Sequence, residues 1–276
     1  MKRLTALILL TILLVSCTES EKRIKLSFKY KPGMQLEYRQ DSKRQTQIYN
    51  TDTLVKDEFD ESYAFIKQNI AEIVNDSTFK IDEIDTWHYT MPNKDDSTQM
   101  DSVTYSREMT LTVLQNGKII DFNFKDTKEN ISEYMKSYYE QGLPIFPSVE
   151  VSPGYSWTQT TSVVLPNETM NASTTYSIKS FVRESGYDCA VIEYTGNLLI
   201  PIEPKKDDKT QRSGIDKIQT NGMIYFAYIE GIVIKQTEIW KTEGERTHIE
   251  DGDWKRQKFI SNYDVNFILI DSKGLR

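Results

Sequence analysis

Two stretches of the sequence share one order of features, and this repeated order constrains the fold more than any other feature. Each places short alternating runs of polar and apolar residues on both sides of a Pro-Gly turn, which predicts strand, turn and strand. The stretches are Lys25–Tyr30, Lys31-Pro32-Gly33 and Met34–Tyr38, and then Val149–Ser152, Pro153-Gly154 and Tyr155–Thr158. The chain therefore reads as two β-rich halves that begin alike.

Later turn signals recur in the same order in both halves. A polar corner precedes a strand-like run at 75–77 and again at 184–186. A hairpin signal follows at Gln115-Asn-Gly117 in the first half and at Glu230-Gly231 in the second. This order predicts a duplicated β-meander, with coincidence among glycine-containing turns as the alternative.

One amphipathic helix is expected between the halves. Asp126 is placed to cap it, with Glu129 as the capping-box partner, and Gly142 supplies a stop before Pro144 and Pro147. Its apolar face follows the spacing i, i+3, i+4 and i+7. The residues of that face are Ile131, Tyr134, Met135 and Tyr138.

The fold class expected from these patterns is mainly β. We expect two curved antiparallel sheets, as a duplicated β-meander or half-barrel, with one connecting amphipathic helix. The predicted units are an N-terminal β half (24–125), a linking helix and Pro-rich loop (126–147) and a C-terminal β half (148–271). Further strands are expected within 62–74 (partly helix-compatible), 102–113, 174–182 and 258–270, and long polar connections at 41–58, 92–101 and 201–220.

The N-terminus predicts export and a lipid anchor. Lys2 and Arg3 precede an apolar run from Leu4 to Val15, which is short for a membrane span. Leu14-Val15-Ser16-Cys17 then resembles a bacterial lipobox, in which cleavage leaves a lipidated cysteine. We therefore expect a signal peptide at 1–16, a lipidated tether at 17–23 and lipidation of Cys17. An ordinary secretory signal with an incidental cysteine is the alternative.

The residue after Cys17 and the overall charge bear on location. Thr18 is not the Asp of bacterial retention rules, and resemblance to those rules implies the outer membrane, on either side of it. The net charge of −7 argues against a nucleic-acid partner and against a basic membrane-binding patch. The membrane is expected as a partner only through the N-terminal lipid.

The sequence contains no recognised catalytic or metal-binding motif. Lipidation of Cys17 leaves Cys189 as the single thiol, expected to be a buried small residue, with a reactive or dimer-forming thiol as the alternative. The two histidines, His88 and His248, have no partner at metal-ligand spacing. We expect no catalytic residue, metal or cofactor, and interpret acids such as Asp82, Glu83 and Asp85 as a solvated face.

Apolar side chains around the helix are the candidate ligand contacts. Tyrosine and methionine suit the walls of adaptable pockets, and the loop after the helix extends that surface. Packing of the same side chains against the sheet is the alternative. The candidate contacts are Ile131, Tyr134, Met135, Tyr138, Leu143 and Phe146.

Together these motifs resemble an uncharacterised family of lipoproteins from Bacteroidota-type bacteria. The resemblance lies in the lipobox, the Pro-Gly strand starts, the segment Leu143-Pro-Ile-Phe-Pro147 and the later run Asn221–Phe226 with Gly231. The wider architecture is similar to Lol-type half-barrel lipoprotein carriers and insertases, where a curved sheet folds over helices. The length and apparent duplication depart from a single small carrier.

The expected function is that of a non-enzymatic, lipid-anchored protein of the bacterial envelope. It would bind an apolar ligand or an envelope partner. A structural or assembly module of the outer membrane without a ligand cavity is the first alternative. A glycan-acting hydrolase is the second, and it predicts two carboxylates in a cleft with shifted pKa values.

Overall fold

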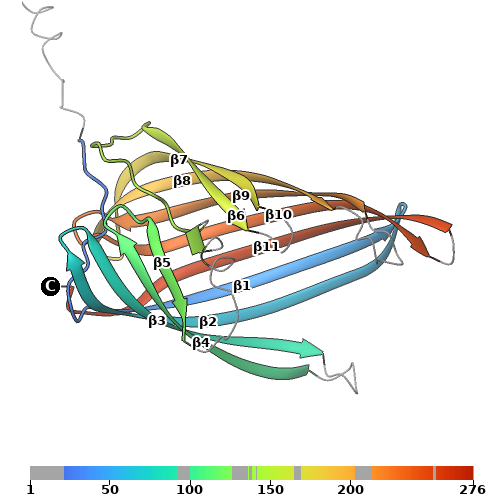
Figure 1. Ribbon diagram of the computed structural model, residues 1–276, viewed down its shortest axis with the longest axis horizontal. Helices are drawn as coiled ribbons and strands as arrows, with labels where there is room; N and C mark the ends of the chain where they lie inside the picture. The colour runs from blue at the N-terminus through green and yellow to red at the C-terminus, as the bar shows by residue number, and fades with distance from the viewer. Residues whose placement is uncertain are drawn as a thin grey trace, which may run out of the picture.

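The described part of the chain is almost entirely β-strand (Figure 1). The computed structural model describes residues 22–92, 100–125, 136, 139–140, 142–164, 169–202, 213–250 and 253–275. Within them lie eleven strands. They are β1 (Gln35–Asn50), β2 (Thr53–Asn75), β3 (Thr78–Pro92), β4 (Met100–Leu114), β5 (Ile119–Phe124), β6 (Ser156–Val164), β7 (Thr169–Glu184), β8 (Tyr187–Ile202), β9 (Ser213–Ala227), β10 (Ile232–Glu250) and β11 (Asp253–Lys273).

All eleven strands belong to one antiparallel sheet in the order β5-β4-β3-β2-β1-β11-β10-β9-β8-β7-β6. The strands β1–β5 form one meander and β6–β11 form another. They join where β1 pairs with β11, from Gln35 opposite Lys273 to Asn50 opposite Gln257. The mainly β, antiparallel prediction is confirmed. The expectation of two sheets is not, because this long central pairing makes the meanders continuous.

The two predicted Pro-Gly turns have the same geometry. Gly33 N donates to Ile70 O at 2.9 Å, and Gly154 N donates to Ile178 O at 2.8 Å. Both glycines have positive φ, 76° and 89°. The strands expected before the turns are instead extended segments that meet at a single antiparallel bridge between Ile24 and Val151. Each turn thus sets the start of the first strand of its meander.

The predicted polar connection at 41–58 is wrong, because these residues form the end of β1, the hairpin turn and the start of β2. Their charged side chains find partners across the ladder. Arg44 Nη2 lies 2.8 Å from Asp60 Oδ2, and Lys43 Nζ lies 2.8 Å from Glu61 Oε1. The helix-compatible run at 62–74 is part of β2. Within the predicted connection at 201–220, residues 213–220 belong to β9.

Only a small part of the predicted helix lies in the described chain. Lys136, Tyr139, Glu140 and Gly142 are helical, and the rest of 126–141 lies outside the described residues. Within the described residues, no helix has the length and apolar character needed to cross a membrane.

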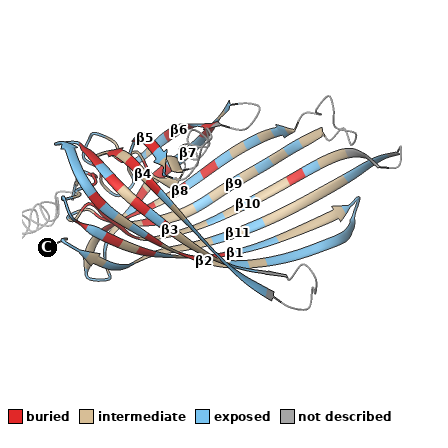
Figure 2. Cartoon of the chain, turned by 60° about the horizontal axis from the view of Figure 1, so that its bottom comes forward, coloured by how far each residue is buried: buried red, intermediate tan, exposed pale blue. Residues whose placement is uncertain are grey.

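The buried residues gather at one end of the sheet (Figure 2). Alternation along the strands places most of them on one face, which we call the inner face. One cluster belongs mainly to the first meander and includes Leu36, Ile66, Ile81 and Leu111. A second includes Tyr176, Ile192, Ile224 and Phe226. Tyr30 and Phe267 pack against both clusters. The far ends of the long hairpins are mostly exposed or half-buried.

The segment 143–147 connects the two edges of the sheet at the end that holds the core. Phe146 N donates to Asn116 O in the turn before β5, at 2.8 Å. On the other edge, Ile145 N donates to Gln159 Oε1 at 2.8 Å, and Trp157 Nε1 donates to Ile145 O at 3.0 Å. Because Trp157 and Gln159 belong to β6, this segment links the terminal strands of both meanders.

Candidate functional site

The inner face encloses a cavity of about 200 Å³, which we call the inner cavity. Side chains from β1–β4, β10 and β11 line it, together with residues of the N-terminal segment and the chain around Tyr139. Alternation along the strands places every second side chain on this wall. The apolar part of the lining includes Ile66, Ile81, Leu111, Val113, Leu143, Val233, Val265 and Phe267.

Two buried acids stand side by side in the wall of the inner cavity. Glu83 and Asp85 are two residues apart on β3, so they share a face, and they are only 4% and 2% exposed. Gln68 Nε2 donates to Glu83 Oε2 at 2.7 Å. Arg107 Nη2 donates to Asp85 Oδ2 at 3.0 Å, and the Tyr139 hydroxyl donates to the same oxygen at 2.9 Å.

Burial controls the charge of this acid pair. Loss of hydration, together with the nearby Asp85 carboxylate, raises the pKa of Glu83 to about 8, against the opposing effect of the Gln68 hydrogen bond. Burial also raises the pKa of Asp85, while Arg107 and the Tyr139 hydroxyl oppose that rise. With a pKa of about 8, the Glu83 carboxyl group keeps its proton at neutral pH.

The same wall has polar atoms whose hydrogen-bonding capacity is unused. Asp85 Oδ1, Trp87 Nε1 and Arg107 Nε are buried and have no hydrogen-bond partner within the described part of the chain. Buried polar atoms are normally satisfied, and such gaps mark places for water or a ligand. All three residues line the inner cavity.

A second polar group lies on the wall formed by the second meander. Burial raises the pKa of Glu238, opposed by hydrogen bonds from Trp240 and Tyr194. Gln236 Nε2 also lies 2.9 Å from the Tyr194 hydroxyl. Tyr194 occupies its position because Gly222 lies beneath it: a Cβ on Gly222 would be 2.2 Å from Tyr194 Cζ. This contact gives a physical role to the glycine of the Asn221–Phe226 run.

The described residues contain two of the predicted ligand contacts. Leu143 lines the inner cavity. Phe146 is 2% exposed and packs in the core, with its ring 5.3 Å from Phe28 and 4.6 Å from Phe226. The other predicted site residues lie outside the described residues: Cys17, Ile131, Tyr134, Met135 and Tyr138.

Sequence reasoning misses most of the polar lining. The prediction of a solvated face is wrong for Glu83 and Asp85. Both acids lie on the buried face of β3, between Ile81 and Trp87 on the same face. That parity is the available signal, and exposed Ile84, on the opposite face, obscures it. Arg107, Tyr139 and Glu238 have no local signal, because they reach the cavity through tertiary pairing.

Among the side chains that the structure describes, His88 and Cys189 do not belong to a second candidate site. His88 Nδ1 lies 3.1 Å from Thr104 Oγ1, and its ring stacks on Tyr63, on the face opposite Glu83. His248 lies in β10. Cys189 is fully buried, as predicted, and burial raises its pKa to about 11. No cluster of three metal-ligating side chains occurs among the residues that the structure covers.

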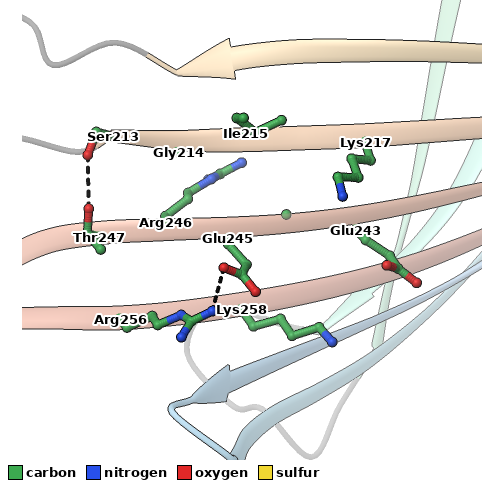
Figure 3. Close-up of a pocket in the computed structure, with 11 residues that line it drawn as sticks. Ser213, Gly214, Ile215, Lys217, Glu243, Glu245, Arg246, Thr247, Arg256 and Lys258 are labelled. Carbon is green, nitrogen blue, oxygen red and sulfur yellow. Dashed lines mark hydrogen bonds and ion pairs between the residues drawn. The ribbon is translucent and has the colours of Figure 1, made fainter.

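A larger hollow, of about 480 Å³, lies on the outer face near the far ends of β9, β10 and β11 (Figure 3). Its charged side chains are exposed or half-buried. Arg256 donates to Glu245 at 2.6 Å, and the side chains of this pair are 64% and 56% exposed. An open hollow lined by partly hydrated charges is a weaker candidate binding site than the inner cavity, whose acids Glu83 and Asp85 are almost fully buried.

Comparisons with known proteins give one sequence match. A family model described as a family of unknown function (DUF6263) matches residues 127–228. No curated protein matches the sequence. Among solved structures, the chain is similar to the COG4313 outer membrane channel from Pseudomonas putida F1, with 8% identity, a TM-score of 0.25, and coverage of 92% of this chain and 100% of that chain.

A second similar structure is OmpF of Salmonella typhi in complex with daunomycin. Its identity is 5% and its TM-score 0.24, with 87% of this chain and 100% of that chain covered. With TM-scores this low, neither similarity bears on what the protein does. The family match spans Tyr139 and Leu143, which line the inner cavity, so part of this cavity falls within a region shared with a family of unknown function.

Proposed function

We propose that this protein is a lipid-anchored protein of the bacterial envelope that binds a small amphipathic ligand in the inner cavity. The observation that carries the proposal is a cavity with an apolar wall and, in the same lining, buried acids with an unpartnered carboxylate oxygen. Ligand sites combine such apolar surfaces with a few placed polar groups. The volume of about 200 Å³ suits a small molecule or a segment of a longer chain.

The lipobox supports the anchoring part of the proposal. The first described residues of the chain are fixed to the end of the sheet that holds the core. Lys29 Nζ donates to the carbonyl oxygens of Tyr228 and Ile229, at 2.9 and 3.1 Å. A lipid on Cys17, five residues before Lys22, would hold this end of the sheet near the membrane surface.

Native mass spectrometry of the purified mature chain tests the ligand. We expect a co-purifying small molecule, and we expect Leu143→Trp to reduce its occupancy, because the larger ring enters the cavity. Leu199→Trp is the matched control, since Leu199 is 58% exposed and lies outside the lining. Equal occupancy in both variants would contradict binding in the inner cavity.

Metabolic labelling with an alkyne fatty acid tests the anchor. The wild-type chain should incorporate the label and fractionate with membranes. Cys17→Ser should lose both properties, because no thiol then accepts the lipid. Label retained by Cys17→Ser would exclude position 17 as the anchor.

A glycan-acting hydrolase is the second candidate, favoured by the raised pKa of Glu83 beside Asp85. The geometry favours binding instead. Both acids project from one strand, whereas glycosidase acids face each other across the sugar, about 5–9.5 Å apart. Hydrolysis of envelope glycans by the wild-type chain and its loss in Glu83→Gln would establish the enzyme. The assembly-module alternative predicts that no ligand occupies the cavity.

A further inference from the structure

The lining of the inner cavity has more acidic than basic side chains. Its lining contains three carboxyl groups, on Glu83, Asp85 and Glu238, and one cationic side chain, Arg107. Arg107 is already committed, because its Nη2 donates to Asp85 at 3.0 Å. An anionic ligand would therefore bring its charge beside buried acids, with no unengaged cation among the described lining residues to receive it.

One acceptor in this wall is buried and open. Asp85 is 2% exposed, and its Oδ1 has no hydrogen-bond partner among the residues that the structure describes. A carboxylate oxygen accepts hydrogen bonds only, so the group that completes it must be a donor. An ammonium group supplies three donors and a positive charge, which suits the surplus of acids.

We propose that the ligand of the inner cavity is an amphipathic primary amine, with its ammonium at Glu83 and Asp85 and its apolar body against Ile81, Leu111 and Phe267. This assignment rests on the proposed function. The indole of Trp87 and the Nε of Arg107 remain as donors for a water or a ligand hydroxyl. Fatty acids and other anionic amphiphiles are excluded by the same arrangement.

Binding of the ammonium would displace the proton from the acid pair. Burial, followed by the nearby Asp85 carboxylate, raises the pKa of Glu83 to about 8, whereas an amine of this kind stays protonated to about pH 10. Amine affinity should therefore rise about tenfold per pH unit from pH 6 to pH 8, with release of about one proton. The groups that interact with Glu83 are Gln68 on β2, Asp85 on β3, Tyr38 on β1, and Tyr30 and Tyr139.

Calorimetric titration of the delipidated mature chain with octylamine, octanol and octanoate tests the proposal. The three probes share an eight-carbon body and differ in the head group. At pH 8 we expect octylamine to bind at least about tenfold more tightly than octanol, and octanoate to bind most weakly. Repeating the octylamine titration in buffers of different ionisation enthalpy counts the released proton.

Variants locate the head group. Glu83→Gln should remove most of the preference for octylamine over octanol, while Glu108→Gln, an exposed change on the outer face of β4, should keep it. The ligand and pH series use the wild-type chain, so they stand even where a variant fails to fold. Octanol or octanoate binding as tightly as octylamine would overturn the amine assignment and leave the proposed function intact. Binding of none of the three probes, with no co-purified ligand, would overturn both.

Discussion

At the residue scale, the least expected feature is a pair of acids inside an apolar cavity. A buried carboxyl group is tolerated when it stays protonated or gains strong partners. Asp85 has Arg107 and the Tyr139 hydroxyl, whereas Glu83 has the neutral amide of Gln68 and the proton that it retains. Because this pair is buried, the free energy of unfolding depends on whether Glu83 carries its proton.

The pH dependence of unfolding follows from the direction of that pKa shift. Between about pH 5 and pH 8 the folded chain keeps a proton on Glu83 that the unfolded chain has lost, so the free energy of unfolding falls as pH rises. The slope from this group is up to about 1.4 kcal/mol per pH unit, and it levels off above about pH 8. In urea denaturation, the free energy of unfolding of Glu83→Gln should fall less steeply than that of the wild-type chain over this pH range.

The control for this measurement is Glu108→Gln, whose side chain is exposed and pairs with Lys125 on the outer face. The free energy of unfolding of Glu108→Gln should fall with rising pH in parallel with that of the wild-type chain. Parallel declines for wild type and Glu83→Gln would show that Glu83 is ionised in the folded protein at neutral pH, and would contradict a retained proton on its carboxyl group.

At the element scale, the turns are more predictable than the strands. The Pro-Gly and Asn-Gly pairs specify backbone angles by local chemistry, and the sequence locates both Pro-Gly turns correctly. The extent of β1 and β2 is missed, because strands with two hydrated faces lack apolar alternation. Their pairing depends on cross-strand partners that are distant along the chain.

Because the two Pro-Gly turns have the same geometry, replacing the glycine of either turn should cost a similar amount of stability. Gly33→Ala and Gly154→Ala should each lower the free energy of unfolding by about 1 kcal/mol, because an alanine side chain disfavours positive φ. No atom lies within 4 Å of the added methyl at either site, so only backbone strain contributes. Thermal or urea unfolding of the purified variants measures the change.

Gly142→Ala is the control for these turns. Gly142 is helical and its added methyl also meets open space, so the substitution should be neutral or slightly stabilising. A large loss of stability in Gly142→Ala, or a loss of stability at only one of the two Pro-Gly turns, would contradict the view that the two turns are equivalent.

At the scale of the whole molecule, the protein is one sheet with two meanders and two neighbouring apolar clusters. Repeated turn order in the sequence predicts two halves, but it does not reveal that β1 and β11 pair, since their contact spans almost the whole chain. For the same reason the sequence does not identify the inner cavity. Its walls come from strands of both meanders, and alternation alone does not say which strands face one another.

Hydrogen exchange should reveal an unequal stability along single strands of this sheet. In β1 the residues near Leu36 and Tyr38 are buried, whereas those from Lys43 to Asn50 are exposed or half-buried on both faces. Local opening is easiest where few apolar contacts must be broken. We expect amides at 36–40 to exchange at least about tenfold more slowly than those at 44–50, and mass spectrometry of peptic fragments resolves the two. Uniform protection along β1 would mean that a second copy of the chain or another partner covers the far ends of the hairpins in solution, against the exposure that the isolated chain shows.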